Sequence, residues 1–292
     1  HEADGRGYIK PGFNHLFVMP ASGGAPRQIT SGDWQHRGAL SWSPDGSKIY
    51  FSGNRVEDWE YRFRNSEVYS VNLESGVIVA LTDRDGPDYN PQISPDGKHI
   101  AYLGYGDKKQ AYQVRKLHLM NIDGSNQRSI SDALDRSISN ITWDSKSGGL
   151  YFNYDDKGNG KVGHISVSGK VTQLADNRGG TTLGRPYGSG SYSVSENGTL
   201  AYTHSRPDYP SEVAILRPKA KIPKKVTDLN SALLDYRTLG KVEEVWYKSS
   251  FDGRDLQGWI VYPPNYDTSK KYSFMVENHG GPILNYGDRF SI

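Results

Sequence analysis

The chain has 292 residues, with 35 Lys and Arg against 33 Asp and Glu, and it contains no cysteine. The net charge of +2 gives no support for a nucleic acid or an anionic membrane as partner, and the lack of cysteine excludes disulfides, thiolate zinc sites and a cysteine nucleophile. Glycine (33) and tyrosine (20) are abundant, which favours an all-β protein, because tyrosine suits half-buried strands and glycine suits tight turns.

The chain opens on His-Glu-Ala-Asp, with neither an initiator methionine nor a signal peptide. We therefore expect a cut end, left by maturation of a precursor or by excision from a longer chain. No apolar run approaches the roughly 18 residues of a membrane span, so we expect a soluble protein. A cysteine-free chain is compatible with the cytoplasm and with the periplasm, so the sequence leaves the compartment open.

One pattern recurs four times: an apolar residue, a turn, and a strand that alternates apolar and polar residues. Each copy has an aliphatic anchor in its strand, and the anchors are spaced 51, 50 and 50 residues apart, at Ile49, Ile100, Leu150 and Leu200. In the first two copies the turn reads Ser-Pro-Asp-Gly. Proline presets the backbone for a turn, aspartate bonds the backbone that follows, and glycine takes the left-handed position. Each copy therefore predicts a β-hairpin.

A second hairpin pattern lies between these copies: a strand, a Gly or Asn turn, and a polar strand that often ends in Thr. It occupies residues 16–30, 68–82, 117–131, 165–174 and 213–227. Two hairpins in each period of about 50 residues make four strands, which is the size of a propeller blade. A β-sandwich with coincidental turns is the competing architecture, and the near-constant spacing favours the propeller.

The pattern changes after Thr227. Residues 228–241 are predicted to be a linker with room for a short helix. Strand candidates follow at residues 244–250, 256–262 and 272–278, and the last of them leads into His-Gly-Gly-Pro. In α/β-hydrolases, the loop after an early strand supplies a backbone N–H to the oxyanion hole, and glycines let that backbone approach the substrate.

These features predict a mainly β fold: a partial β-propeller of four-stranded blades, followed by the first strands of an α/β-hydrolase domain. Residues 1–227 would form the blades, the first of them incomplete. Residues 228–241 would form the linker. Residues 242–292 would form the start of a truncated catalytic domain.

The order of propeller, Lys-Ser-x-x-Asp-Gly, strand-Pro-Pro and His-Gly-Gly-Pro resembles the prolyl oligopeptidase family of serine peptidases, nearest its acylaminoacyl-peptidase and dipeptidyl-peptidase branches. The resemblance covers essentially the whole chain, including residues 4–8 and 285–290. It implies a seven-bladed propeller that restricts access to a Ser-His-Asp triad, so that only short or unfolded peptides are hydrolysed.

The family pattern assigns roles to three residues of the His-Gly-Gly-Pro motif. Gly281 would donate its backbone N–H to the oxyanion, Gly280 would shape the loop, and His279 would be a structural hydrogen-bonding residue. No Gly-x-Ser-x-Gly occurs in the chain, and in this fold the triad follows the oxyanion loop. We therefore expect the triad beyond Ile292, and we expect this chain alone to be inactive.

Acidic residues at Glu57, Asp58 and Glu60 lie in a polar insertion within a blade. In dipeptidyl-peptidase relatives, propeller acids bind the free N-terminus of the substrate, so the resemblance implies substrate binding by Glu57 and Glu60. A solvated loop is the competing interpretation. Arginines at positions 62, 64 and 115 are alternative ligands for a substrate carboxylate. No metal-binding or phosphate-loop spacing is present, so we expect no cofactor and no metal.

Two other classes of function compete with the peptidase. One is a non-enzymatic propeller that binds a protein partner, like the periplasmic Tol-system propeller. The other is a propeller lyase acting on oligosaccharides, which would need histidines and metal ligands at the central channel. Residues 242–292 favour the peptidase, because a binding propeller has no use for them. The expected partners are a peptide substrate, the remainder of the catalytic domain and, to cover open strand edges, a second copy of the chain.

Overall fold

The computed structural model describes residues 12–180, 182, 185–280 and 284–291. The predicted family segment at residues 4–8 therefore lies outside the described residues. The chain divides into two compact units, His1–Gly149 with Val167–Gly169 and Leu150–Ser166 with Lys170–Ile292.

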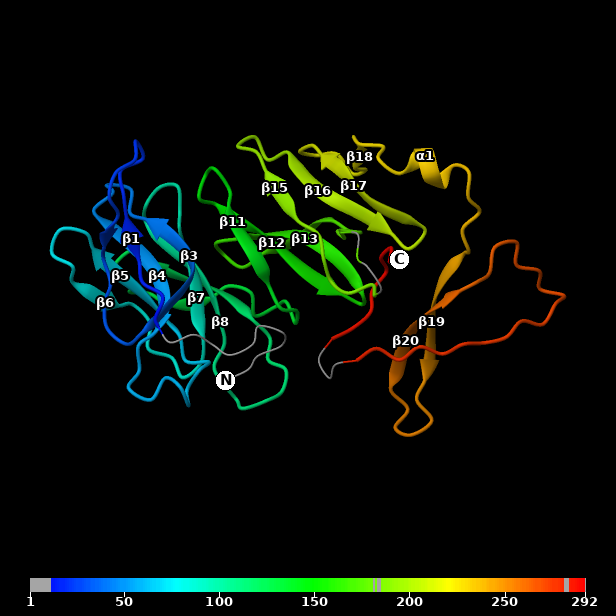
Figure 1. Ribbon diagram of the computed structural model, residues 1–292, viewed down its shortest axis with the longest axis horizontal. Coiled ribbons are helices and arrows are strands. Elements are labelled where there is room, and N and C mark those ends of the chain that lie inside the picture. Colours follow the sequence, from blue (N-terminus) through cyan, green and yellow to red (C-terminus); the bar gives the residue numbers. More distant parts are fainter. Residues whose placement is uncertain (1–11, 181, 183–184, 281–283, 292) are drawn as a thin grey trace. The chain divides into compact units, whose positions relative to one another are not determined.

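Four-stranded antiparallel sheets with strands in chain order dominate the structure (Figure 1). The short strands β1 (Phe17–Val18) and β2 (Arg27–Gln28) pair with each other ahead of these sheets. The first sheet contains β3 (Gln35–Trp42), β4 (Lys48–Asn54), β5 (Glu67–Asn72) and β6 (Ile78–Ala80). The second contains β7 (Asp88–Ile93), β8 (His99–Gly104), β9 (Lys116–Asn121) and β10 (Arg128–Ser129).

Two further sheets repeat this arrangement. The third contains β11 (Ser139–Trp143), β12 (Gly149–Asp156), β13 (Asn159–Ser166) and β14 (Val171–Ala175). The fourth contains β15 (Tyr192–Val194), β16 (Leu200–Arg206), β17 (Tyr209–Leu216) and β18 (Lys224–Lys225). Both predicted hairpins occur in each sheet, which confirms the prediction of four-stranded units in a mainly β fold.

The Ser-Pro-Asp-Gly turns fold as their residue types predict. In the first, the Ser43 hydroxyl donates a 2.6 Å hydrogen bond to Asp45, and Gly46 has a φ of 70°. The hydrogen bond from Ser43 is the largest of the contacts that lower the pKa of Asp45 to about 2. The second turn repeats the contact, with 2.6 Å between Ser94 and Asp96. The same local chemistry therefore produces the first hairpin of both sheets.

A hydroxyl closes the second hairpin of most repeats. The backbone N–H of an apolar residue donates to a Thr or Ser hydroxyl 14 residues later, at 2.9 Å in each case, in the pairs Leu16–Thr30, Val68–Thr82, Leu117–Ser131 and Val213–Thr227. This hydroxyl continues the hydrogen bonding where the strand pairing ends, so that a backbone donor is not left unpaired. It explains why the predicted fourth strand so often ends in Thr.

The hydrophobic core lies between successive sheets. In the first unit, Tyr50 and Val68 of the first sheet pack with Ile100, Tyr102 and Met120 of the second. In the second unit, side chains of β13 and β14 pack with those of β16 and β17. The four predicted anchors are 2, 0, 0 and 2% exposed in chain order, at Ile49, Ile100, Leu150 and Leu200. Face-to-face packing of consecutive four-stranded sheets is what propeller blades require.

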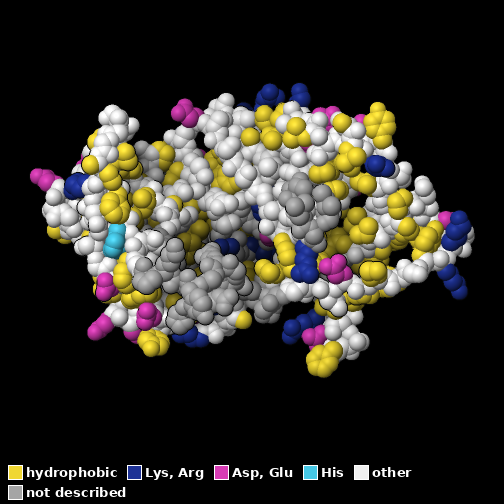
Figure 2. Space-filling view, in the orientation of Figure 1, with side chains coloured by type: hydrophobic (Ala, Val, Ile, Leu, Met, Phe, Trp, Pro, Cys, Tyr) yellow, Lys and Arg dark blue, Asp and Glu magenta, His cyan; other side chains and the backbone are white. Residues whose placement is uncertain are grey.

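The C-terminal region begins with α1 (Ser231–Leu234), within the predicted linker. It continues with the antiparallel hairpin of β19 (Val242–Lys248) and β20 (Asp255–Val261), as predicted. Figure 2 shows hydrophobic side chains at the surface in this region, and Tyr247 and Val261 are among those exposed. The domain boundary between residues 227 and 228 stays a prediction.

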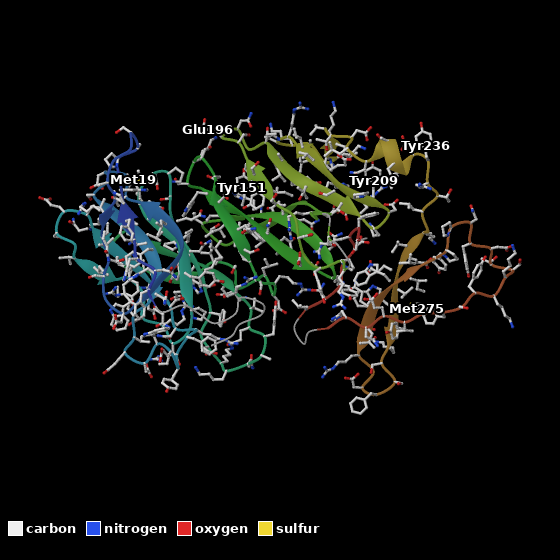
Figure 3. The ribbon with its side chains drawn as sticks, viewed as in Figure 1. Met19, Tyr151, Glu196, Tyr209, Tyr236 and Met275 are labelled. Atoms are coloured by element: carbon white, nitrogen blue, oxygen red, sulfur yellow. The ribbon has the colours of Figure 1, made fainter. Side chains whose placement is uncertain are left out.

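The predicted strand at residues 272–278 is wrong for this structure, which has no strand there. Phe274 is 80% exposed and Met275, labelled in Figure 3, is 90% exposed. A strand requires a neighbour to accept its backbone hydrogen bonds, and no described residue pairs with this segment. The apolar pattern of this segment is compatible with a strand, but a strand forms only where a neighbouring strand pairs with it.

None of the helices in the described ranges has the length and apolar character needed to cross a membrane.

Candidate functional site

The predicted oxyanion loop begins with His279 and Gly280, both exposed. The His279 Nδ1 lies 2.9 Å from the Gly280 carbonyl oxygen, and the His279 ring lies 5.3 Å from the Tyr286 ring. A Cβ built at Gly280 would meet no described atom within 4 Å, which leaves this side of the backbone open to close approach. Gly281 lies outside the described residues, so the predicted roles in this loop stay predictions.

The segment after this loop, residues 285–291, is bound by loops of the third and fourth sheets and by the end of β16; we call it the C-terminal segment. Its backbone N–H groups donate to the Pro186 and Gly158 carbonyls and to the Ser205 hydroxyl, at 3.0, 2.9 and 3.3 Å. The Thr182 hydroxyl donates to the carbonyl of Phe290 at 3.3 Å. Several elements that are distant in sequence therefore hold this segment.

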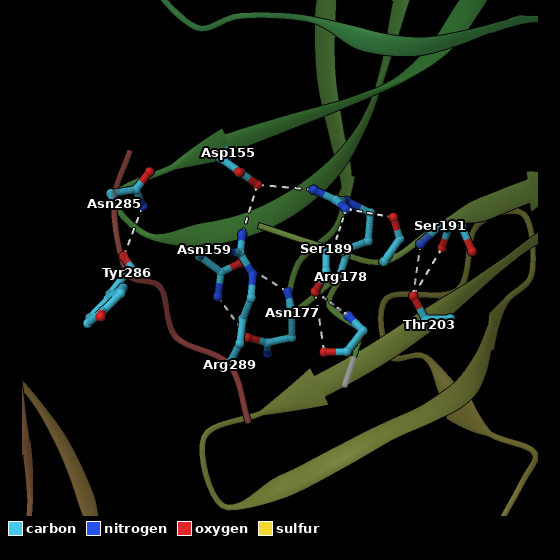
Figure 4. A network of polar contacts seen from close by, with 12 residues as sticks. Asp155, Asn159, Asn177, Arg178, Ser189, Ser191, Thr203, Asn285, Tyr286 and Arg289 are labelled. Atoms are coloured by element: carbon cyan, nitrogen blue, oxygen red, sulfur yellow. Dashed lines mark hydrogen bonds and ion pairs between the residues drawn. The ribbon is translucent and has the colours of Figure 1, made fainter. Parts of the chain in front are cut away.

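An ion-pair network fixes the same segment to the end of β12 (Figure 4). Asp155 Oδ1 accepts from Arg178 Nη2 and from Arg289 Nη2, both at 3.0 Å. The side chains of Arg289 and Arg178 are 1 and 7% exposed, whereas that of Asp155 is 39% exposed. Arg178 also donates through Nη1 to the carbonyls of Ser189 and Gly190, at 2.6 and 3.0 Å. Burial lowers the pKa of Arg178, and Asp155 opposes that shift.

Glycine is required where the C-terminal segment meets the turn between β12 and β13. A Cβ at Gly287 would clash with the Gly158 carbonyl oxygen and lie 2.7 Å from Arg289 Nη1. A Cβ at Gly158, which has a φ of 72°, would lie within 2.6 Å of the Trp259 ring of β20. Gln257 of β20 donates to the Lys157 carbonyl of the same turn at 2.8 Å. One tight turn thus contacts both the C-terminal hairpin and the C-terminal segment.

The structure places Glu57 and Glu60 at exposed positions in the connection between β4 and β5. In the part of the chain that the structure describes, neither carboxylate forms an ion pair. A pocket of about 480 Å³ lies beside this connection, between residues 61–65 and 107–111. Arg62 and Arg64 line it, whereas Glu57 and Glu60 do not, and Arg115 does not either. Substrate binding by the two glutamates stays a prediction.

Sequence reasoning missed a buried polar cluster in the first unit. Arg84 lies 3.2 Å from Asp88 and 3.0 Å from the ring of His118, and the Thr82 hydroxyl donates to Glu67. Burial raises the pKa of Glu67 and of Asp88 to about 7 each, and it lowers that of His118 to about 4. Neither this cluster nor any other part of the described residues contains a group of three or more His, Asp or Glu that could hold a metal ion.

Comparison with known proteins shows similarity to dipeptidyl peptidases. Residues 6–112 match the family model described as the N-terminal region of dipeptidyl peptidase IV. Dipeptidyl-peptidase 5 of Porphyromonas gingivalis is 28% identical over 262 residues, which cover 89% of this chain and 37% of that protein. The chain thus spans little more than a third of the length of this relative.

Two solved structures share the fold. A candidate dipeptidyl aminopeptidase IV from Bacteroides ovatus has a TM-score of 0.60 at 17% identity, covering 93% of this chain and 40% of its own. A prolyl endopeptidase structure has a TM-score of 0.58 at 12% identity, covering 88% of this chain and 36% of its own. These two structures show a shared fold, and the sequence matches to dipeptidyl peptidases agree with the resemblance found in the sequence. The Porphyromonas gingivalis relative carries a dipeptidyl-peptidase name, and the acylaminoacyl-peptidase branch stays a prediction.

Proposed function

We propose that the full-length protein containing this chain is a serine-type dipeptidyl-peptidase that hydrolyses short peptides. The observation that carries the proposal is the similarity to dipeptidyl-peptidase 5 of Porphyromonas gingivalis over 89% of this chain. The competing interpretation, a propeller that only binds a protein, gives no role to β19, β20 and the His-Gly-Gly-Pro that follows them.

In the proposed reaction, this chain and the rest of the protein would supply different catalytic groups. A serine oxygen attacks the scissile carbonyl while histidine takes the serine proton, and the carbonyl π electrons move onto the oxygen. A backbone N–H of this chain, at Gly281, would stabilise that oxyanion. The loss of one such donor typically costs about 3 kcal/mol of transition-state stabilisation. The blades would restrict entry to short peptides, and the remainder of the catalytic domain would supply the triad.

The test uses the full-length protein with chromogenic dipeptide substrates that carry either a free or an acetylated N-terminus. We expect hydrolysis of the free form, labelling of the protein by a fluorophosphonate serine probe, and no turnover by residues 1–292 alone. A full-length protein that is neither labelled nor active would refute the proposal and favour the binding propeller. Preference for the acetylated substrate would instead favour an acylaminoacyl-peptidase.

A further inference from the structure

We infer that Asp155, Arg178 and Arg289 are positioning residues, which hold the C-terminal segment in place and thereby orient the start of the predicted oxyanion loop, His279–Gly280. The inference rests on the proposed function, because it assigns these residues a role in that reaction. None of these three residues contacts the reacting atoms. Each acts through the C-terminal segment that it holds.

The network depends on a single carboxylate. Both guanidinium groups donate to the same oxygen, Asp155 Oδ1, each at 3.0 Å. Among the described residues, Nε of Arg178 and both Nε and Nη1 of Arg289 are buried without a hydrogen-bond acceptor. Two buried cations therefore share one ion-pair partner, and removing it leaves both guanidinium groups without an ion pair among the described residues. The position of Arg289 is for this reason more sensitive to Asp155 than an exposed ion pair would be.

A continuous set of contacts joins the network to the loop. Three residues before Arg289, the ring of Tyr286 lies 5.3 Å from that of Tyr187 and 5.3 Å from that of His279. The Tyr286 hydroxyl donates a 2.8 Å hydrogen bond to Glu277, which precedes the loop. Tyr286 therefore connects the residues on the two sides of the His-Gly-Gly-Pro motif, and Arg289 fixes the chain just beyond it.

A displacement of the C-terminal segment should lower the rate of catalysis. A misplacement of about 1 Å at a reacting group can cost about 100-fold in rate. The oxyanion contact is formed in the transition state, so the loss should fall on kcat rather than on KM. A purely structural role would lower stability and leave kcat unchanged in the folded protein.

The experiment compares Asp155→Asn with Asp156→Asn in the full-length protein. Asp156 is the next residue of β12 and pairs with Lys161 at 3.1 Å, outside the network, so its variant is a matched control. Hydrogen exchange is followed at Gly287, Asp288 and Phe290, whose N–H groups donate to neighbouring segments of the third and fourth sheets. We expect Asp155→Asn to speed this exchange at least tenfold and to lower kcat ten- to a hundredfold with KM within about twofold. Asp156→Asn should change neither.

Arg289→Lys provides the second variant should Asp155→Asn fail to fold, because lysine keeps the charge but not the planar fork. It should give a smaller loss of kcat than Arg289→Met. Faster exchange with unchanged kcat would overturn the positioning role, and unchanged exchange would overturn the network itself. An inactive wild-type protein would overturn the proposed function and the catalytic role together, while the exchange measurements would still decide whether the network holds the segment.

Discussion

At the scale of single residues, the C-terminal segment is held by close approaches and by buried charges. No local sequence pattern predicts these contacts. Gly287 packs directly against the Gly158 carbonyl, and Asp155 pairs with Arg289, a residue 134 positions away. By contrast, Glu57 and Glu60, which are predicted to bind substrate, are exposed. Their predicted role depends on contact with a bound substrate.

Gly287→Ala should loosen the C-terminal segment, because the added methyl group has no room beside the Gly158 carbonyl oxygen. We expect limited proteolysis after residue 280 to become at least several-fold faster, measured by mass spectrometry of the products. Gly106→Ala is the control, since a Cβ there would meet nothing within 4 Å. Equal cleavage rates in both variants would show that the segment is not held at this contact.

Glu57→Gln and Glu60→Gln test the predicted capture of a free substrate N-terminus. A hydrogen bond to a charged group is worth about 1.5–3 kcal/mol, so loss of the relevant carboxylate should raise KM for a free dipeptide substrate about tenfold or more. KM for the acetylated substrate should not change. Glu74→Gln, at an exposed turn, is the matched control. Unchanged KM values in both glutamate variants would support the solvated-loop interpretation.

At the scale of elements, the first two four-stranded sheets are each specified by two small hydroxyl-centred contacts. The Ser-Pro-Asp-Gly turn begins the first hairpin, and a Thr or Ser hydroxyl closes the second. These contacts join residues close in sequence, which is why the hairpins were predictable. The segment at residues 272–278 shows the limit of such reasoning, because its strand pattern lacks a neighbour to pair with.

Thr82→Val should destabilise the first sheet. The substitution keeps the shape but leaves the Val68 N–H without its acceptor and removes the donor to Glu67. A buried polar group left unpaired costs about 1–3 kcal/mol, which urea denaturation can measure. Thr82→Ser keeps the hydroxyl and should cost distinctly less. If both variants lose the same stability, the hydroxyl is not the cause.

At the scale of the whole molecule, stability should depend on pH through the cluster between the first two sheets. Glu67 and Asp88 have pKa values raised to about 7, so the folded state binds more protons than the unfolded state from about pH 4 to 7. Their contribution is therefore lost as the pH rises through that window. His118 acts in the opposite direction, because its pKa of about 4 favours the fold above pH 6.5 and disfavours it as the pH falls.

Within this cluster two carboxylates outweigh one histidine, so the contribution of the cluster to the free energy of unfolding should fall between pH 5 and pH 7.5. Asp88→Asn should flatten this fall, measured as the urea midpoint at several pH values. Asp45→Asn is the control, since the pKa of Asp45 is lowered to about 2 and lies outside the window. An Asp88→Asn midpoint that follows the same pH dependence as that of the wild-type protein would contradict the prediction.

The sequence by itself determined the repeat, the four-stranded units and the anchors of the core, because these depend on local turn chemistry and on alternation within a strand. The order of the motifs along the chain carried the resemblance to peptidases. Only the tertiary structure decided that the segment at 272–278 is unpaired, that Arg84, Asp88 and His118 are buried together, and that Asp155, Arg178 and Arg289 meet. These outcomes depend on which distant residues the packing of sheets brings within hydrogen-bonding range, and separation along the chain carries no signal of that proximity.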